Sequence, residues 1–404
     1  MSNPVSDLES VRIERPAAGG GVAHLSDGRV VFVRHSLPGE LVRVVLREET
    51  AKIARADAVQ VLEASPERVV PPCSYARPGG CGGCDFQHAS LAAQLDWKAT
   101  LVSEHLQRIA GVARAVSVTP LSHDAHTRTR LRCGVDERGA LGLRQSRSND
   151  VVTIASCQAA DERFSDAFAT PWPHAEEVEL RAIGDGQPFA LVRRQTDRGS
   201  LFELTTLFGE PLEPATRSRV AVQGHYFDVS PRSFWQSHRD APDVLLRAVL
   251  ELTDVSAGDH VVDLFSGVGL FSIPLARRVG HTGRVVAVES SPYAVRDARH
   301  NADGLSQLRV REWSVTPRAI NDAVSAGDVV VLDPPRSGLA KGVAAALVRR
   351  APRRLVYVSC DAATFARDVK TLLAGGYRLG DLRVFDAFPM TEHVELVAVL
   401  DLSA

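Results

Sequence analysis

Residues 353–369, RRLVYVSCDAATFARDV, form a short apolar run that stops at a polar triplet and passes into a helical pattern. The four apolar residues from Leu355 have the composition of a buried strand, so Cys360 would lie where that strand ends. In open α/β sheets, ligands bind at this carboxyl edge, and a reactive side chain there is a candidate for chemistry. An isolated cysteine is more often a small buried hydrophobe, so the rest of the chain must decide.

From residue 260 onward, apolar strand patterns alternate with helical patterns. This alternation predicts an α/β fold with a largely parallel, doubly wound, Rossmann-like sheet that carries helices on both faces. Two late strands without an intervening helix predict an antiparallel hairpin at one edge of that sheet. The expected strands are residues 261–265, 284–289, 308–311, 328–332, 355–358, 381–385 and 394–400.

Residues 263–269, DLFSGVG, follow the first of these strands and open a helix. Glycines in such a turn let a ligand approach the backbone closely, and Glu289, at the end of the next strand, could hold a ribose hydroxyl. The third glycine of the dinucleotide fingerprint is missing. The pattern therefore favours S-adenosylmethionine over a nicotinamide cofactor.

Residues 333–338, DPPRSG, end another strand. The two prolines stiffen the turn and hold the Asp333 carboxylate at the sheet edge, where it could accept a hydrogen bond from a ring nitrogen. The alternative is that this segment is only a rigid turn between a strand and a helix.

The N-terminal two hundred residues have different patterns. Residues 1–66 alternate apolar and polar positions, with strands expected at 30–33, 41–46 and 58–62, and this predicts a small OB-like β-barrel of a kind that often binds nucleic acid. Residues 67–225 predict a mixed α+β central domain, with a helix expected over 91–109. Residues 226–404 then form the domain of the parallel sheet. Turns are expected at Gly19-Gly20-Gly21, Asp27-Gly28 and Pro38-Gly39.

The composition is that of an ordinary globular protein, with 45% hydrophobic and 24% charged residues. A formal net charge of −2 argues against a protein that coats nucleic acid indiscriminately, although a local basic face would still permit specific binding. We expect a cytoplasmic protein without a membrane partner, because there is no signal peptide and no apolar run long enough to span a bilayer. The six cysteines are then not expected to form disulfides.

Residues 126–147 contain six arginines against two acidic residues. In a strand, Arg128, Arg130 and Arg132 would lie on one face because side chains alternate with a period of two. Such a row of guanidiniums could grip phosphates. A solvated sheet face explains the pattern equally well.

These motifs resemble the RNA uracil-5 methyltransferase family. The resemblance covers nearly the whole chain: an N-terminal TRAM-type barrel, a cysteine-bearing middle domain and a class I methyltransferase domain. It implies transfer of a methyl group from S-adenosylmethionine to C5 of a specific uridine in RNA, with ribosomal RNA favoured over transfer RNA. The motifs that carry it occur in the family's order and are SFWQSH (233–238), DLFSGVG (263–269), DPPRSG (333–338), VSCD (358–361) and HVE (393–395).

The resemblance also implies roles for particular residues. Cys360 would add to uracil C6 and make C5 nucleophilic, and Glu395 would remove the C5 proton after methyl transfer. Glu392 is expected to be a surface or supporting carboxylate. The target base would be flipped out of the folded RNA to reach the pocket. Candidate substrate contacts are Gln236, Asp333, Phe234, Arg130 and Arg132, and candidate cofactor contacts are Gln236, Asp263, Phe265, Gly267, Gly269, Glu289 and Asp333.

By the same resemblance, Cys73, Cys81, Cys84 and Cys157 hold a [4Fe-4S] cluster. A four-thiolate zinc site is the alternative, but such sites usually supply two close cysteine pairs, and only one close pair is present here. Cys133 is the spare candidate ligand. A structural role is expected for the cluster because the reaction moves no electrons.

Two other functions compete with this hypothesis. The Asp-Pro-Pro motif would also suit an amino-group methyltransferase acting on an RNA base, but those enzymes usually carry an aromatic residue where this chain has Arg336. A non-catalytic, RNA-binding iron-sulfur protein would keep the barrel and the cysteines. No obligate protein partner is implied by the sequence.

Overall fold

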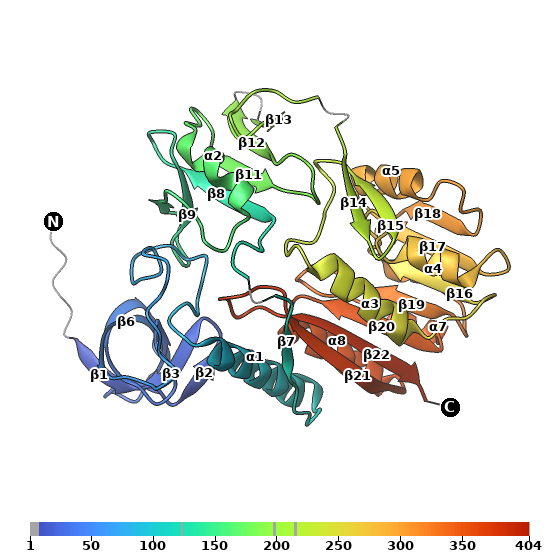
Figure 1. Cartoon of the computed structure of the whole chain (residues 1–404). Coiled ribbons are helices and arrows are strands. Elements are labelled where there is room, and N and C mark those ends of the chain that lie inside the picture. The colour runs from blue at the N-terminus through green and yellow to red at the C-terminus, as the bar shows by residue number, and fades with distance from the viewer. Residues whose placement is uncertain (1–7, 123, 197–198, 214–215, 404) are drawn as a thin grey trace.

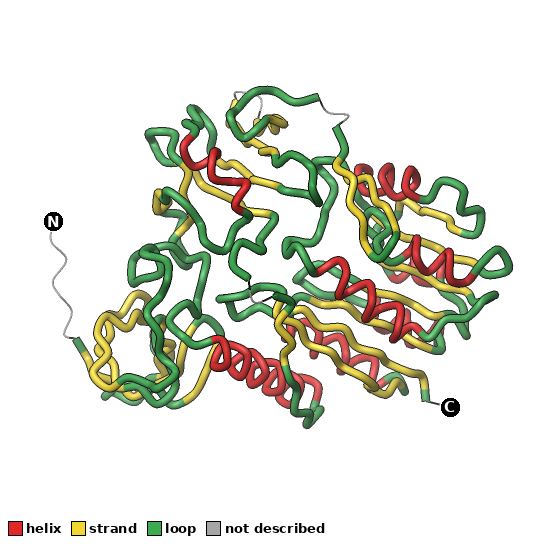
Figure 2. The backbone as a smooth tube through the Cα atoms, in the orientation of Figure 1, coloured by secondary structure: helices red, strands yellow, loops and turns green. Residues whose placement is uncertain are grey.

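The computed structural model describes residues 8–122, 124–196, 199–213 and 216–403. Within these ranges the chain forms a six-stranded N-terminal sheet, a six-stranded central sheet, a two-stranded hairpin and an eight-stranded C-terminal sheet. Figure 1 shows the N-terminal strands wrapped into a barrel-like unit, set apart from the large C-terminal sheet. The tube in Figure 2 shows that long loops join the central sheet to its neighbours.

The N-terminal sheet encloses a core of its own, built from small apolar side chains such as Val31, Val33 and Val42. The glycine turn is shorter than predicted, because Gly20 and Gly21 lie inside a strand and a Cβ at Gly20 would stand 2.1 Å from the Val33 carbonyl oxygen. The strands, in sheet order, are β1 (Glu9–Arg12), β5 (Leu41–Glu49), β6 (Ile53–Glu63), β4 (Val30–Arg34), β3 (Gly20–His24) and β2 (Arg15–Ala17).

The central sheet is antiparallel throughout and buries Phe164 and Trp172 against one face. Two short helices, η2 (Glu162–Phe164) and α2 (Ser165–Ala169), complete a mixed α+β unit, as predicted. The strands, in sheet order, are β10 (Val151–Thr153), β9 (Leu141–Arg144), β8 (Arg130–Val135), β11 (Glu177–Arg181), β12 (Phe189–Thr196) and β13 (Gly199–Thr205).

The C-terminal sheet has the predicted doubly wound arrangement, in which five parallel strands are followed by the antiparallel hairpin of β22 and β21. Its core strands are apolar on both sides because helices cover both faces. The strands, in sheet order, are β18 (Leu308–Glu312), β17 (Arg284–Glu289), β16 (His260–Leu264), β19 (Val329–Leu332), β20 (Arg354–Ser359), β22 (Glu395–Leu402), β21 (Tyr377–Asp386) and β7 (Val118–Pro120).

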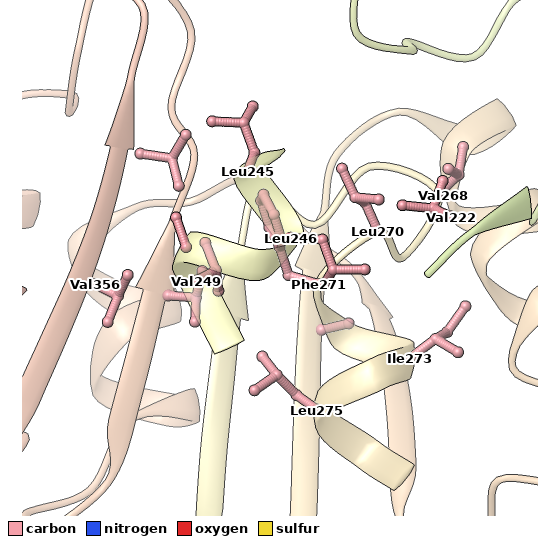
Figure 3. Close-up of a cluster of buried hydrophobic side chains, with 14 of the residues drawn as sticks. Val222, Leu245, Leu246, Val249, Val268, Leu270, Phe271, Ile273, Leu275 and Val356 are labelled. Atoms are coloured by element: carbon pink, nitrogen blue, oxygen red, sulfur yellow. The ribbon is translucent and has the colours of Figure 1, made fainter. Parts of the chain in front are cut away.

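Each face of this sheet has its own helix layer. On one face, side chains such as Leu245 and Ile273 from α3 and α4 belong to the core cluster that packs on the sheet, and Figure 3 shows part of this cluster. On the other face, α6, α7 and α8 bury Tyr357 and Phe365. No helix in the described part of the chain is long and apolar enough to cross a membrane. The helices are α3 (Ala241–Thr253), α4 (Ser272–Val279), α5 (Pro292–Asn301), α6 (Pro317–Ala323), α7 (Val343–Arg350) and α8 (Ala362–Ala374).

Two features of the layout differ from the prediction. The antiparallel hairpin is not at the sheet edge, because β7 pairs in parallel with β21 and brings α1 (Leu91–His105) and η1 (Leu106–Ala110) against α8. The expected boundary at residue 225 falls inside the hairpin of β14 (Ser218–Val222) and β15 (His225–Val229), whose apolar side chains are buried in the same core as α3. Segments of the expected central domain therefore complete the C-terminal one.

Candidate active site

Strand register brings the proposed nucleophile and base together. The antiparallel pairing of β20 with β22 matches Ser359 with Leu396, so Cys360, one residue on, lies opposite Glu395, one residue back. On the other side of β20, the parallel strand β19 ends at Leu332, paired with Tyr357, and is followed by Asp333. Because these strand ends meet at one edge, Cys360 is flanked by two carboxylates.

The surroundings of Cys360 hold its thiol in the protonated form. Burial, together with the nearby Glu395 and Asp333 carboxylates, raises the pKa of Cys360 to about 12. Arg336, from the DPPRSG turn, opposes this shift through its charge and a hydrogen bond. At neutral pH the thiol must therefore lose its proton to a neighbour when it reacts.

The carboxylates at this edge favour their neutral forms as well. Glu395 is 3% exposed, and burial, followed by the charge of Asp333, raises its pKa well above the ordinary value. Burial and the charge of Asp263 raise the pKa of Asp333 to about 7. A group of buried acids that cannot all ionise at once can hold and pass protons near neutral pH.

The glycine turn after β16 leaves open space beside its backbone. Gly267 has a φ of 54°, and no atom lies within 4 Å of a Cβ built there. Glu289 fixes the turn, since its carboxylate accepts hydrogen bonds from the backbone N–H of Gly267 at 3.0 Å and of Ser291 at 2.7 Å. Gly269 has a φ of 97°, and a Cβ there would meet Ile273 at 2.8 Å. Both glycines are therefore required by the geometry of the turn.

Two buried polar atoms at the end of β16 and in this turn have no hydrogen-bond partner among the described residues: Oδ1 of Asp263 and Oγ of Ser266. The other carboxylate oxygen of Asp263 accepts a hydrogen bond from the Ser272 hydroxyl. Phe265 lies between the two residues in the left-handed region, with φ 64°. Buried polar groups normally find partners, so this turn is suited to a polar ligand that supplies them.

The loop of residues 231–238 lies against the central sheet. Gln236 and Ser237 accept hydrogen bonds through their backbone carbonyls from Thr129, at 3.2 Å from its hydroxyl and 2.7 Å from its N–H. Gln236 lines a small cavity with Thr129, Arg130 and Arg181. Phe234 is 51% exposed, as a stacking platform would need to be.

Arg181 is a residue that the sequence analysis missed. Its buried guanidinium donates to the carbonyl oxygens of Pro231 at 2.8 Å and Ser233 at 2.7 Å, and it forms an ion pair with Glu179 at 2.6 Å. It therefore fixes the start of the loop that carries Phe234 and Gln236. Nothing in its sequence context separates Arg181 from the other arginines, because the two carbonyls that it binds lie some fifty positions away.

The arginine row is already paired with carboxylates. Arg130 forms an ion pair with Glu179 at 2.8 Å, and Arg132 forms one with Glu177 at 2.6 Å, both across to β11. Arg128 precedes β8, and its backbone forms isolated β-bridges with Ala160 and His238. The Arg132 side chain is 65% exposed and remains accessible to a phosphate.

The four cysteines of the proposed cluster line one cavity. Cys73, Cys81 and Cys84 come from the loop before α1, Cys157 follows β10, and burial raises the pKa of Cys81 to about 11. Cys133, the spare candidate, is fully buried in the central core and does not line this cavity. Among the described residues, no group of three or more His, Cys, Asp or Glu side chains is arranged to hold a metal ion as it stands.

Glu392 is half-buried. It lines a cleft between the barrel and the turn that joins β9 to β10, and its buried Oε2 atom has no hydrogen-bond partner among the described residues. Burial and the neighbouring Asp85 raise the pKa of Glu392 to about 7. Of the two roles expected for Glu392, surface or supporting carboxylate, the half-buried position beside the barrel favours the supporting one.

The order of the parallel strands, the glycine turn and the carboxylates at the strand ends define a Rossmann-like methyltransferase. Residues 216–402 match the family described as tRNA (Uracil-5-)-methyltransferase. The chain is 38% identical to an RNA methyltransferase of Streptomyces avermitilis, over 96% of this chain and 97% of that one. It is 33% identical to the 23S rRNA (uracil(1939)-C(5))-methyltransferase RlmD of Acinetobacter baylyi, over 95% and 93% of the two chains.

Among solved structures, the Pyrococcus abyssi tRNA (uracil-54, C5)-methyltransferase in complex with S-adenosyl-L-homocysteine matches with a TM-score of 0.71. It is 26% identical, and the match covers 96% of this chain and 99% of that chain. The chain belongs to the family of RNA uracil-C5 methyltransferases. It is therefore an RNA-modifying enzyme, which removes the non-catalytic alternative.

Proposed function

We propose that this enzyme methylates C5 of a specific uridine through a covalent bond between Cys360 and uracil C6. The observation that carries the proposal is the strand register: Cys360, directly after β20, lies opposite Glu395, the first residue of β22. C5 of uracil is a poor nucleophile, and addition of a thiolate to C6 turns C5 into an enolate carbon that can attack an electrophilic methyl group.

In the first step, the Cys360 sulfur bonds to C6 while the thiol proton passes to one of the carboxylates at this edge of the sheet. The electrons of the C5–C6 double bond move toward O4. Together, the side chains of Asp333 and Gln236 accept a hydrogen bond from uracil N3–H and donate one to uracil O4. Cytosine has an acceptor at N3 and a donor at C4, so it does not fit these two side chains. The raised pKa of Asp333, about 7, suits a group that exchanges a proton with its surroundings at neutral pH.

In the second step, C5 takes the methyl group. When bound, S-adenosylmethionine would supply this methyl group from its positively charged sulfur and would become S-adenosylhomocysteine. The ionised Glu395 carboxylate then removes the C5 proton, the C5–C6 double bond reforms, and Cys360 leaves as the thiolate. Burial of Glu395 raises its pKa and so makes it a stronger base once it is ionised.

The glycine turn is the proposed site for the methyl donor. Glu289, at the end of β17, suits the ribose hydroxyls, and the unpartnered Asp263 and Ser266 atoms offer hydrogen-bonding positions in the same turn. Gly267 leaves room for the ligand, and Phe265 is half-buried beside it. With Gly269, Gln236 and Asp333, these residues are the cofactor contacts that we propose.

A ribosomal RNA is the proposed substrate. Support comes from curated relatives that span nearly the whole chain and are named as 23S rRNA methyltransferases, in Acinetobacter baylyi and in Edwardsiella ictaluri at 34% identity. The similar archaeal structure is named as a transfer RNA enzyme, so transfer RNA is the alternative. Mapping of 5-methyluridine in total RNA from cells with and without the gene decides between them: a lost ribosomal position supports the proposal and a lost transfer RNA position contradicts it.

The cysteine cavity is the proposed site of a [4Fe-4S] cluster. Four thiols converge on a cavity whose other walls include Tyr75, Leu143 and Ile154, a largely apolar surround of the kind that such clusters occupy. When bound, the cluster would tie the loop before α1 to the segment after β10. Its role would be structural, because methyl transfer needs no electrons.

The test of the proposed activity is release of tritium from RNA labelled at uracil C5, measured with S-adenosylmethionine. Each turnover must release the C5 hydrogen, so tritium should appear in water in step with methylation. Methylation of an amino group on adenine or guanine, without tritium release, would contradict the proposal.

A further inference from the structure

The proposed base stands at the end of a loop that two segments far away in the sequence hold. We call residues 387–394, which connect β21 to β22 and lead directly into Glu395, the base loop. Lys98 of α1 is fully buried, and its Nζ donates to Oδ1 of Asp386 at 2.5 Å and to the carbonyl oxygen of Phe388 at 3.0 Å. Helix α1 lies against β7 and α8, at the edge of the sheet that contains β21 and β22 (Figure 1).

The middle of the base loop is held at Met390. Its N–H donates to Oε1 of Gln94 at 3.2 Å, and its carbonyl oxygen accepts from the N–H of Asp85 at 2.7 Å and of Phe86 at 2.9 Å. Asp85 and Phe86 directly follow Cys84. Met390 has a φ of 64°, in the left-handed region that non-glycine residues avoid, so outside contacts must keep it there.

These contacts act on the position of the Glu395 carboxylate. Phe385 is paired with Glu395 across β21 and β22, so Asp386 is the first residue beyond that pair. A buried ammonium is costly unless it is paired and hydrogen-bonded, and both partners of Lys98 lie on the segment that returns to Glu395. The Lys98 charge therefore strongly favours the single loop conformation that satisfies it.

We propose that Lys98 and Gln94 are positioning residues for Glu395: they hold the base loop so that the carboxylate faces the C5 proton of the covalent intermediate. The proposal rests on the proposed function, in which Glu395 acts only after methyl transfer. Loss of the contacts that Lys98 and Gln94 make with this segment should then slow breakdown of the methylated RNA–protein adduct and leave the rates of the earlier steps unchanged. A general loss of structure would slow formation and breakdown together.

The main variant replaces the whole buried pair, as Lys98→Met with Asp386→Leu. Removing one charge alone would leave the other buried and unpaired, whereas replacing both by apolar side chains is often neutral for stability. The hydrogen bond to the Phe388 carbonyl is still lost. Gln94→Met is the second variant, because it removes only the acceptor of the Met390 N–H and remains informative if the double variant does not fold.

The measurement is a single-turnover reaction followed in two ways: formation of S-adenosylhomocysteine, and the amount of RNA–protein adduct that survives denaturing electrophoresis. We expect adduct breakdown to slow on the order of 10-fold or more in both variants, with methyl transfer changed less than about threefold, since small misplacement of a catalytic group has effects of this size. Arg68→Met with Glu40→Gln is the matched control, because it removes both charges of another buried ion pair, and the hydrogen bonds of Arg68 go to Glu40 and the His35 carbonyl rather than to the base loop.

Glu395→Gln, measured in parallel, separates this proposal from the proposed function. If Glu395→Gln accumulates adduct while the Lys98/Asp386 and Gln94 variants break it down at the wild-type rate, the positioning role is wrong and the mechanism stands. If Glu395→Gln accumulates none, the base assignment fails and the positioning role fails with it. Equal slowing of methyl transfer and breakdown in the folded variants, or selective slowing of breakdown in the Arg68/Glu40 control, would also overturn the positioning role.

Discussion

The sheet edge around Cys360 and the loops that surround it are built by different means. At the edge, Cys360, Asp333 and Glu395 are brought together by the pairing of β19, β20 and β22, which is fixed once the strands pair. The cysteine cavity and the 231–238 loop are held by single contacts from far along the chain, such as those of Arg181. Backbone register thus brings the chemical groups to one edge. Isolated buried side chains hold the loops that recognise ligands, and in our proposal two more of them, Lys98 and Gln94, orient the Glu395 carboxylate.

The first prediction tests the chemical side of this contrast. Cys360→Ala should reduce tritium release from labelled RNA by about 10³-fold or more, because the nucleophile has no substitute among the groups at this edge. The backbone pairing of β20 does not depend on the side chain, so RNA affinity in a filter-binding assay should stay near the wild-type value. Tritium release by Cys360→Ala at the wild-type rate would remove Cys360 from the mechanism.

The second prediction concerns the loop-built cavity. After anaerobic reconstitution, the wild-type protein should bind about four iron and four sulfide per chain, and Cys157→Ala should lose most of both. Cys133→Ala is the control, since that thiol is buried outside the cavity and should not affect iron content. Iron loss in Cys133→Ala but not in Cys157→Ala, or stoichiometric zinc in place of iron, would contradict the assignment.

The third prediction sharpens the electrostatic description of the edge. Ionised Asp333 disfavours the Cys360 thiolate and Arg336 favours it, so Asp333→Asn should lower the pKa of Cys360 and Arg336→Gln should raise it. Between pH 8 and 10, alkylation of Cys360 by iodoacetamide should be faster in the first variant and slower in the second, because the thiolate fraction follows the pKa of Cys360. Peptide mass spectrometry isolates Cys360 from the other thiols, and rate changes in the same direction in both variants would refute this description.

The smallest expected effect is on RNA affinity. Arg132→Ala should weaken binding by less than about tenfold and reduce the slope of log affinity against log salt by about one, as loss of one phosphate contact would. Val135→Ala, on the same strand but without a charge, serves as the control. An unchanged salt slope would mean that Arg132 acts only through its ion pair with Glu177.

Sequence patterns were sufficient for the parts of the molecule that follow local periodicity. The strands of the doubly wound sheet and the glycine turn were predicted within a few residues, because apolar runs and turn residues specify them locally. Contacts between distant segments carried no such signal. The pairing of β7 with β21 lies in a three-residue strand, too short for a pattern, and it displaced the predicted edge hairpin.

The same limit applied within the site. Cys360 and Glu395 could be proposed from their motifs, whereas Lys98 and Arg181 look like ordinary charges of a helix and a strand. Burial gives them their roles, and burial depends on how the barrel, the central sheet and the C-terminal sheet pack together. For the same reason, the sequence neighbours of Glu392 do not reveal that it lies beside the barrel.

The most direct measurement is mass spectrometry of the Glu395→Gln enzyme after incubation with RNA and S-adenosylmethionine. If Cys360 and Glu395 act as nucleophile and base on one uracil, a persistent adduct should form whose RNA-bearing peptide contains Cys360 and a methylated uridine. Absence of the adduct with methylation continuing at the wild-type rate, or an adduct on another cysteine, would contradict the paired roles of these two residues.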